Sequence, residues 1–575
     1  MIIFRDASRE VETREELGAL ARLADSRDGL GFVVRLGEFE QAVLDATHPT
    51  ADGWSALAAA FRRALVAAAG EFLEAGNHTA RAEPLRRALA EVEAVAAQFP
   101  PRLRVRPPEG YAHYALDPGA YARAAAKYRV DVGAAHAARA VVIGVRSIGT
   151  SLSAVVAAAV GSSTAVTVRP RGPSGGRQVL ADGALVTRLL TWLGAGGDVL
   201  VVDEGPGATG ETFAAVASWL RGLGVDERRI VLFPSRGWGM PLAPPDRVAW
   251  FERARKYPPS PGDERPTRIA EGFGLGPLDD LCAGRWRSVV PGAATFPASP
   301  THERLKYRAT APAGDSVVIR YAGLGRWGAD VLERARRLAD RGIGPEPIGS
   351  REGFLVLRWV AGTPLAPQAE CDSTLVHALG DYLATRSTEL RTGREVDPAP
   401  IIEALRVNAT EALGAAAPGL RAALRRLERL PAREAVTPDA RLQRREWLRT
   451  ANRLVKVDAI DHGDGLRLPG PTDAAWDIAG AVVEFGLDRE ATEALVRRCA
   501  GARSAEIAVL TRAVDAYLPA YAAVHLADAV LAMREAAEPI ERARWAHEAR
   551  RYRAALAATL VRGRDIGAVM RRRAA

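Results

Sequence analysis

The segment of residues 198–213, DVLVVDEGPGATGETF, joins an apolar run to a helical pattern through a glycine-rich turn. The three glycines of this turn let the backbone approach an anion closely. Residues 209–212 would begin the following helix, where free N–H groups and the helix dipole favour phosphate. The turn therefore predicts a phosphate-binding loop. The adjacent acids Asp203 and Glu204 suit sugar hydroxyls, or a magnesium ion bound through water.

Two other interpretations of this turn remain open. GPGATGET has the spacing of the phosphate loop of nucleoside triphosphatases, G-x-x-x-x-G-K-[ST], but Glu211 stands where the lysine is required. Because an acid there would repel the terminal phosphates, we do not favour a nucleoside triphosphatase. The segment is also compatible with an ordinary glycine-rich turn that connects a strand to a helix and binds no ligand.

The run resembles the signature loop of type I phosphoribosyltransferases, which has a hydrophobic strand, two acids, a few small residues and then Thr-Gly-x-Thr. The resemblance implies that Asp203 and Glu204 hold the ribose 2- and 3-hydroxyls of phosphoribosyl pyrophosphate. The backbone that would hold the 5-phosphate belongs to Ala208, Thr209, Gly210, Glu211 and Thr212. This sequence departs from the family by one extra residue before Thr-Gly, and by Gly-Pro-Gly where apolar residues are usual.

The same family places its pyrophosphate loop directly after an earlier strand, and VVIGVRSIGTSLS (141–153) fits that position. By resemblance, Arg146 meets the pyrophosphate, helped by backbone N–H groups of the residues that follow it: Ser147, Ile148, Gly149 and Thr150. Substitution at the ribose anomeric carbon needs charge stabilisation on the departing pyrophosphate, from Mg²⁺ and Arg146, more than a strong base. The alternative for Arg146 is an ordinary surface arginine.

The arginine-rich stretch VRPRGPSGGR offers three further contacts to the same ligand, or is simply a solvated loop. These arginines are Arg169, Arg171 and Arg177.

A second candidate site lies in the stretch VKVDAIDHGDGLRLPGPTDAAWDIAGA, residues 455–481, which crowds five aspartates beside a strand-like run. Carboxylates this dense at a strand end can bind Mg²⁺, which takes oxygen ligands and often bridges substrate phosphates. The stretch is equally compatible with a solvated acidic loop in which Asp477 caps the next helix.

This part of the chain resembles aminoglycoside- and choline-kinase-like phosphotransferases, in which a lobe with a β-sheet is followed in sequence by a helical lobe. The resemblance implies that Asp458 or Asp461 is a metal ligand and that Asp477, in WDIAG, is the structural aspartate. In the small lobe, Arg320 stands in VVIRY where a lysine is expected, with Glu333 as its possible partner. The segment WVAG (359–362) resembles the hinge, and ATP would be the nucleotide.

The catalytic loop of those kinases, His-Gly-Asp with Asn five residues on, is absent from its expected place. TPDARLQRREW (437–447) stands there instead, and offers Asp439 as base and Glu446 as a second metal ligand. Because phosphoryl transfer depends on correct charge placement, the missing lysine and Asn leave both an active kinase and an inactive kinase-like unit open.

The chain has 575 residues, and the secondary structure predicted around these candidate residues changes along it, which indicates several domains. Residues 1–105 show helical periodicity and predict a helical N-terminal region. In residues 106–265 apolar strands alternate with helices, as in a parallel sheet covered on both faces, the α/β fold of a phosphoribosyltransferase. Residues 285–575 read as a small sheet and then helices, an α+β two-lobed kinase-like unit.

Composition narrows the class of protein. The three cysteines, Cys282, Cys371 and Cys499, lie far apart, so we expect neither a disulfide framework nor a zinc site. The net charge of +9 comes from 78 basic and 69 acidic residues without a basic run, so we expect no nucleic-acid partner. We find no signal peptide and no uninterrupted apolar span, and we therefore expect a cytoplasmic protein without a membrane partner.

We therefore expect a phosphoribosyltransferase that uses or forms phosphoribosyl pyrophosphate with Mg²⁺. It would be coupled to a kinase-like domain that acts on a ribose-containing small molecule, such as a nucleoside, nucleotide or base. The alternative is a non-enzymatic regulator or pseudokinase that binds phosphoribosyl ligands or nucleotides.

Overall fold

The computed structural model describes residues 1–4, 8–76, 79–173, 175–207, 209–237, 240, 242–260, 264–299, 303–366, 370–501 and 504–561. The chain divides into two compact units. Residues 8–265 and 323–327 form the first, here called the N-terminal unit. Residues 1–7, 266–322 and 328–575 form the second, the C-terminal unit. The helical region and the α/β sheet, which we predicted as separate domains, thus share one compact unit.

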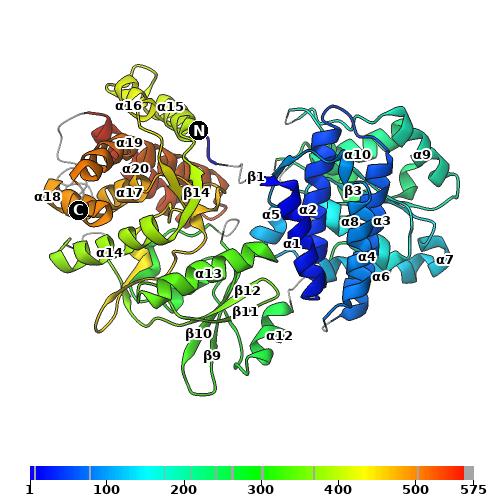
Figure 1. The fold of residues 1–575 in the computed structure, drawn as a ribbon, viewed down its shortest axis with the longest axis horizontal. Coiled ribbons are helices and arrows are strands. Elements are labelled where there is room, and N and C mark those ends of the chain that lie inside the picture. Colours follow the sequence, from blue (N-terminus) through cyan, green and yellow to red (C-terminus); the bar gives the residue numbers. More distant parts are fainter. Residues whose placement is uncertain are drawn as a thin grey trace. The chain divides into compact units, whose positions relative to one another are not determined.

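A parallel sheet forms the centre of the N-terminal unit, in the strand order β4-β3-β5-β6-β7 (Figure 1). Its strands are β3 (Val141–Val145), β4 (Ala165–Val168), β5 (Val199–Val202), β6 (Ile230–Phe233) and β7 (Arg255–Lys256). The first four are buried along their whole length, as expected of strands covered on both faces. The predicted α/β parallel sheet is therefore present.

Alternate residues of these strands face two different layers. One face packs against apolar residues of α9 (Gly183–Leu193), α10 (Glu211–Gly222) and α11 (Pro245–Arg253). The short apolar helix α8 (Gly149–Val160) contacts β3, β4 and β5, and it also packs on α6 (Pro118–Val132). Two single-turn helices, α5 (Glu109–Ala112) and α7 (Ala134–Ala137), complete this region.

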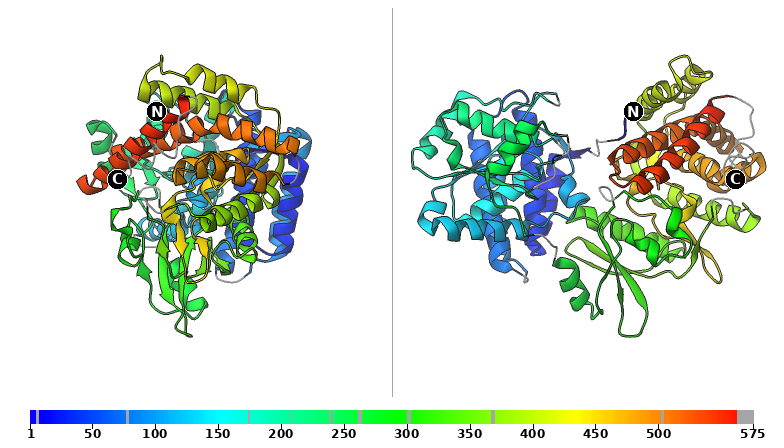
Figure 2. Two further views of the ribbon diagram at one scale, coloured as in Figure 1. Left: turned by 90° about the vertical axis from the view of Figure 1, so that its left-hand side faces the viewer. Right: turned by 180° about the vertical axis from the view of Figure 1, so that it is seen from behind.

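The predicted helical region is confirmed as four helices that stand side by side (Figures 1 and 2). They are α1 (Thr13–Asp25), α2 (Gly29–Thr47), α3 (Ala56–Ala75) and α4 (Ala82–Glu93), with the paired strands β1 (Arg9–Glu12) and β2 (Arg102–Val105) beside them. Their apolar residues form one core with Ala154 and Val155 of α8. The helical region is therefore packed directly on the helix that follows β3.

The C-terminal unit begins with an antiparallel sheet in the order β11-β12-β10-β9-β8. Its strands are β8 (Asp279–Asp280), β9 (Lys306–Thr310), β10 (Ser316–Tyr321), β11 (Pro347–Arg351) and β12 (Phe354–Arg358). Strands β10 and β12 pair with each other, and Val318 lies opposite Leu357. The helices of this part are α12 (Arg265–Gly272) and α13 (Arg326–Asp340).

Helices dominate the rest of this unit (Figure 2). They are α14 (Ser373–Glu389), α15 (Ala399–Leu413), α16 (Leu420–Glu428), α17 (Ala475–Phe485), α18 (Arg489–Ala500), α19 (Ser504–Glu535) and α20 (Pro539–Leu560). The stretch between α16 and α17 holds the short strands β15 (Glu434–Val436), β16 (Trp447–Arg449) and β17 (Leu454–Lys456). Strand β16 pairs with β17 and with β13 (Thr363–Pro364), and β15 pairs with β14 (Arg391–Glu395).

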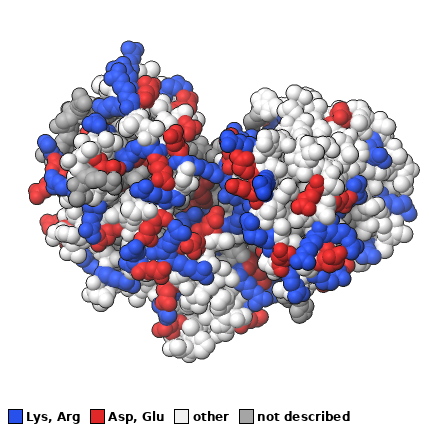
Figure 3. All heavy atoms as spheres, in the orientation of Figure 1, with Lys and Arg blue, Asp and Glu red and all other residues white. Residues whose placement is uncertain are grey.

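Two surface properties bear on the expected partners. Among the described residues one helix, α19, is long and apolar enough to cross a membrane, and 78% of its apolar window is buried inside the structure. Such burial is typical of the core helix of a folded unit. Basic and acidic side chains are interspersed on the face drawn in Figure 3.

Candidate functional site

The two predicted anion-binding loops follow neighbouring strands of the parallel sheet. Strand β3 lies between β4 and β5, with Val145 opposite Val168 and Gly144 opposite Val202. The strand order reverses at β3, and α/β sheets bind ligands outside the carboxyl ends of the strands at such a point. The loops touch there, because a Cβ on Gly149 would come within 2.6 Å of the Val202 carbonyl oxygen.

The acids Asp203 and Glu204 stand directly after β5 and are held by neutral groups. The Asp203 carboxylate accepts hydrogen bonds from the Glu204 N–H at 2.8 Å and from the Thr212 hydroxyl at 3.0 Å. The Tyr121 hydroxyl donates to the Asp203 carbonyl at 3.0 Å. Glu204 lies against Gly110, where an added Cβ would be 3.0 Å from the glutamate carboxyl group.

These surroundings disfavour the charged form of both acids. Burial raises the pKa of Asp203 to about 6, although the Glu204 N–H and Thr212 hydroxyl oppose the shift. Burial, and then the charges of Asp203 and Glu109, raise the pKa of Glu204 to about 8. Arg177 and Arg169 act on Asp203, and Arg236 on Glu204, but among the described residues no cation forms an ion pair with either acid. Both acids can therefore accept sugar hydroxyls or a cation.

The helix that follows the loop starts as predicted, with Gly210 in a left-handed conformation (φ 63°) before α10. This left-handed conformation favours glycine, and a Cβ there would lie 2.2 Å from the sulfur of the flexible Met240 side chain. The Glu211 side chain is buried and faces Arg177, whose backbone N–H donates to it at 3.3 Å. Thr209 is half-buried, and Arg247 donates to its carbonyl at 2.9 Å. Ala208 lies outside the described residues.

The predicted pyrophosphate loop leads into α8, which begins at Gly149. Only Ser147 in this loop is partly exposed, since Ile148, Gly149 and Thr150 are buried. Arg146 is also buried, and its guanidinium forms ion pairs with Asp45, at 3.0 Å, and with Asp52. Both aspartates belong to the helical region. To contact pyrophosphate, Arg146 must therefore exchange these partners, which no sequence pattern indicates.

The arginine-rich loop after β4 joins the same ion-pair cluster. Arg169 pairs with Asp45 at 2.5 Å and its backbone N–H donates to Asp52 at 2.7 Å. Arg171 pairs with Asp52 at 3.0 Å. The structure thus brings two of the three predicted arginines to Arg146, while Arg177 lies at Glu211. Two carboxylates here face three guanidinium groups, which leaves a positive excess suited to an anion.

The second predicted site gathers in the C-terminal unit, around Asp439. This residue follows β15, is fully buried, and accepts a hydrogen bond from the Tyr382 hydroxyl at 2.5 Å. The Asp477 carboxylate accepts hydrogen bonds from the backbone N–H groups of Asp439, at 2.8 Å, and Ala440, at 3.0 Å. Asp477 therefore fixes the turn that carries Asp439, rather than capping its own helix with its side chain.

Arginine side chains bind Asp458 and Asp461, the acids that the sequence singled out as alternative metal ligands. Arg320 donates to Asp458 at 2.9 Å and to Asp461 at 2.8 Å. Arg304 also pairs with Asp461, at 2.5 Å. Glu333 is not the partner of Arg320: its carboxylate is half exposed and accepts from Arg337, one turn further along α13. This part of the prediction is wrong, because Glu333 stands on the solvent-facing side of the helix.

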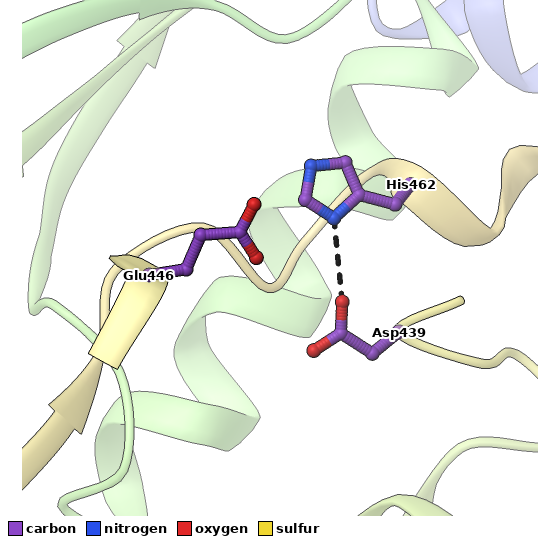
Figure 4. A group of neighbouring side chains, drawn as sticks. All are labelled: Asp439, Glu446 and His462. Atoms are coloured by element: carbon purple, nitrogen blue, oxygen red, sulfur yellow. Dashed lines mark hydrogen bonds and ion pairs between the residues drawn. The ribbon is translucent and has the colours of Figure 1, made fainter. Parts of the chain in front are cut away.

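Sequence reasoning missed Lys456 and His462, which occupy the middle of this cluster. The Lys456 ammonium lies 3.1 Å from Asp439 and 2.7 Å from Glu446, and the side chain has no exposed surface. His462 lies between two acids, with Nδ1 3.3 Å from Asp439 and Nε2 3.2 Å from Asp458. Figure 4 shows Asp439, Glu446 and His462 pointing toward one another.

The charges of the cluster support one another. Burial opposes the charged form of Asp439, but the nearby Lys456 and His462 outweigh it and hold the pKa of that carboxyl well below its usual range. Burial and Arg441 disfavour protonated His462, yet Asp458 and Asp439 prevail and raise the pKa of His462 to about 9. The cluster is therefore a set of formal ion pairs at neutral pH.

Two overlapping groups of side chains come near enough to share a metal ion, with ligand atoms within 4.8 Å of one another. They are Asp439, Glu446 and His462, and Asp458, Asp461 and His462. Predicted ligand Glu446 is thus grouped with the predicted base and not with Asp458 and Asp461. Basic side chains of the protein already contact every one of these carboxylates. The distances within the cluster would suit a divalent ion, but its charges are already paired.

Comparison with known proteins gives structural neighbours for about half of the chain. No protein-family model and no curated protein sequence matches it. A Plasmodium vivax ethanolamine kinase shares 10% identity, with 51% of this chain and 95% of that one covered and a TM-score of 0.33. A choline/ethanolamine kinase family protein from Mesorhizobium loti shares 20% identity, with 54% of this chain and 99% of that one covered and a TM-score of 0.32. A Streptococcus pneumoniae choline kinase shares 12% identity, with 50% of this chain and 96% of that one covered and a TM-score of 0.31. At such identities and TM-scores, function has to be argued from the site itself.

Proposed function

We propose that the N-terminal unit is a phosphoribosyltransferase that binds phosphoribosyl pyrophosphate at the carboxyl ends of β3 and β5. One observation supports this most strongly. Two glycine-containing loops follow adjacent parallel strands at the point where the strand order reverses, and an Asp-Glu pair opens the second of these loops. The resemblance of residues 198–213 to the phosphoribosyltransferase signature assigns a role to each part of this arrangement.

In this proposal Asp203 and Glu204 accept hydrogen bonds from the two ribose hydroxyls. The N–H groups at the start of α10 hold the 5-phosphate, since the helix dipole favours an anion there. Thr212 positions the Asp203 carboxylate through its 3.0 Å hydrogen bond. The arginines beyond β3 and β4 supply positive charge toward the pyrophosphate, which leaves as the bond at the anomeric carbon breaks.

Magnesium would neutralise the pyrophosphate when bound, and the residues here fit it. Asp203 and Glu204 are carboxylates whose described hydrogen-bond donors are neutral, and their pKa values are raised to about 6 and about 8. A nearby cation would lower both pKa values and charge both groups. These acids would hold the ion directly or through water.

The decisive measurement is calorimetric titration of the full chain with phosphoribosyl pyrophosphate in the presence of Mg²⁺. We expect binding that is lost in the double variant Asp203→Asn/Glu204→Gln. The matched control is Asp226→Asn/Glu227→Gln, an exposed Asp-Glu pair of the same unit, which should bind as the parent does. Equal binding by the first variant would refute the ribose assignment.

For the C-terminal unit we propose a phosphotransferase fold that binds a nucleotide, with Asp439 as the base. The supporting observation is the fixation of Asp439 by Asp477, together with the acids that follow β17. An ATP-turnover assay tests the proposal, and Asp439→Asn should abolish any turnover that the parent shows. Asp381→Asn, an exposed acid on α14, is the control. Nucleotide binding without turnover in the parent would instead favour a regulatory unit.

A further inference from the structure

The side chain of Lys456 stands where a metal ion would have to sit between two acids. Its ammonium lies 3.1 Å from Asp439 Oδ2 and 2.7 Å from Glu446 Oε2 and also donates to the Asp458 carbonyl oxygen. The side chain is completely buried. Strand β17 fixes its backbone, with Lys456 opposite Trp447 in the pairing with β16. The ammonium is therefore held in place by both its strand and its partners.

The remaining acids are also matched by cations of the chain. Arg320 bridges Asp458 and Asp461, and Arg441 lies 3.1 Å from Asp458. Arg441 also contacts Glu446 at 2.6 Å, as a close ion pair rather than an aligned hydrogen bond. Five acids, Asp439, Glu446, Asp458, Asp461 and Asp464, thus face four permanent cations, Lys456, Arg320, Arg441 and Arg304, together with the imidazole of His462.

Such a balance opposes a divalent ion on two grounds. Mg²⁺ binds through anionic and carbonyl oxygens at about 2.0–2.1 Å, so Asp439 and Glu446 could reach it only where the ammonium now lies. A second cation beside Lys456 would also be repelled, and repulsion between buried charges is poorly screened. Because the acids already have partners, little electrostatic energy is left for a metal to gain.

We propose that Lys456 is the resident cation of this site and takes the position of a divalent metal between Asp439 and Glu446. Loss of the ammonium would therefore convert the site into a divalent-cation site. This goes beyond the proposed nucleotide-binding function and does not depend on it, because the claim concerns the cation alone.

The test uses Mn²⁺ as probe and counts bound ions by electron paramagnetic resonance on the full chain. All variants carry Asp203→Asn/Glu204→Gln, so that the other proposed metal site does not contribute. We expect no stoichiometric Mn²⁺ in this background and one Mn²⁺ per chain after Lys456→Met, which keeps the bulk and removes the charge. Adding Glu446→Gln to Lys456→Met should abolish the gain, whereas Lys256→Met in the N-terminal unit is the control without gain.

Two results would overturn the proposal. One is a stoichiometric Mn²⁺ in the background chain that Glu446→Gln removes, since metal and Lys456 would then share the site. The other is a folded Lys456→Met variant, judged by circular dichroism, that gains no Mn²⁺. Should Lys456→Met fail to fold, the background chain decides alone: absence of the ion supports the resident ammonium, and its presence at Glu446 refutes it.

Discussion

The carboxylate of Asp477, on α17, accepts a hydrogen bond from the backbone N–H of Asp439 at 2.8 Å, across 38 residues of sequence. The next N–H, that of Ala440, donates to the same carboxylate at 3.0 Å, and Ala440 has a positive φ of 65°. An alanine in this conformation is strained, so the turn depends on these two hydrogen bonds for its shape.

We expect Asp477→Ala to lower the free energy of unfolding of the C-terminal unit by about 3 kcal/mol, because two hydrogen bonds to a buried charged acceptor are lost. Calorimetric melting of the full chain measures this. The control, Asp488→Ala, removes an exposed helix cap on α18 and should cost only about 1 kcal/mol. Equal effects of the two variants would mean that Asp477 does not fix the turn.

The pH dependence of stability provides a test of Glu204. Its pKa is raised from 4.5 to about 8, so between these values the folded chain holds a proton that the unfolded chain releases. The contribution of Glu204 to the free energy of unfolding must therefore fall as the pH rises from 4.5 to 8. Glu204→Gln removes this contribution, and its melting temperature relative to the parent should be higher at pH 8 than at pH 5. Exposed Glu227→Gln should show no such trend.

Much of the N-terminal unit follows from sequence pattern. The apolar runs at 140–145 and 198–202 each become a buried strand, and the glycine-rich turn after the second begins a helix as predicted. Proximity of the two loops also follows, because parallel strands end at one edge of the sheet. What the sequence could not show is that Asp45 and Asp52, a hundred residues upstream, would pair with Arg146.

The C-terminal site shows a similar limit. Asp458 and Asp461 stand out as acids after a strand, and both do lie in the cluster. Lys456 was overlooked because a lysine between two valines in a short strand is typical of a solvent-facing position. Its burial arises only when the loop of residues 437–446 folds over β17, a contact that no local pattern predicts. The one sequence feature that could have indicated Lys456 is its position two residues before Asp458, the first aspartate of the acidic stretch.

The ion pairs of Asp45 predict a gain of function. Asp45 is partly exposed and contacts both Arg146 and Arg169, so it competes with any anion for these two guanidinium groups. Asp45→Asn should strengthen pyrophosphate binding roughly tenfold, which corresponds to ~1.4 kcal/mol. Calorimetric titration of the full chain with pyrophosphate measures this, with exposed Asp226→Asn as the control. Unchanged affinity would place the pyrophosphate away from Arg146.

The last prediction concerns Arg320, which the sequence placed at the position of a nucleotide-binding lysine. In the structure its two terminal nitrogens bridge Asp458 and Asp461, so the guanidinium is a partner of buried acids. Arg320→Ala should destabilise the C-terminal unit by about 3–5 kcal/mol, because it leaves these carboxylates without their shared cation. Arg320→Lys keeps the charge but cannot contact both carboxylates at once, and its loss of stability should be intermediate.

Glu333→Gln, which affects only the exposed pair with Arg337, should change stability by less than about 0.5 kcal/mol. Urea unfolding of the full chain, followed by tryptophan fluorescence, ranks the three variants. A large effect of Glu333→Gln would mean that the unfolding signal does not distinguish buried from exposed ion pairs, and a neutral Arg320→Ala would mean that Lys456, Arg304 and Arg441 balance the acids without it.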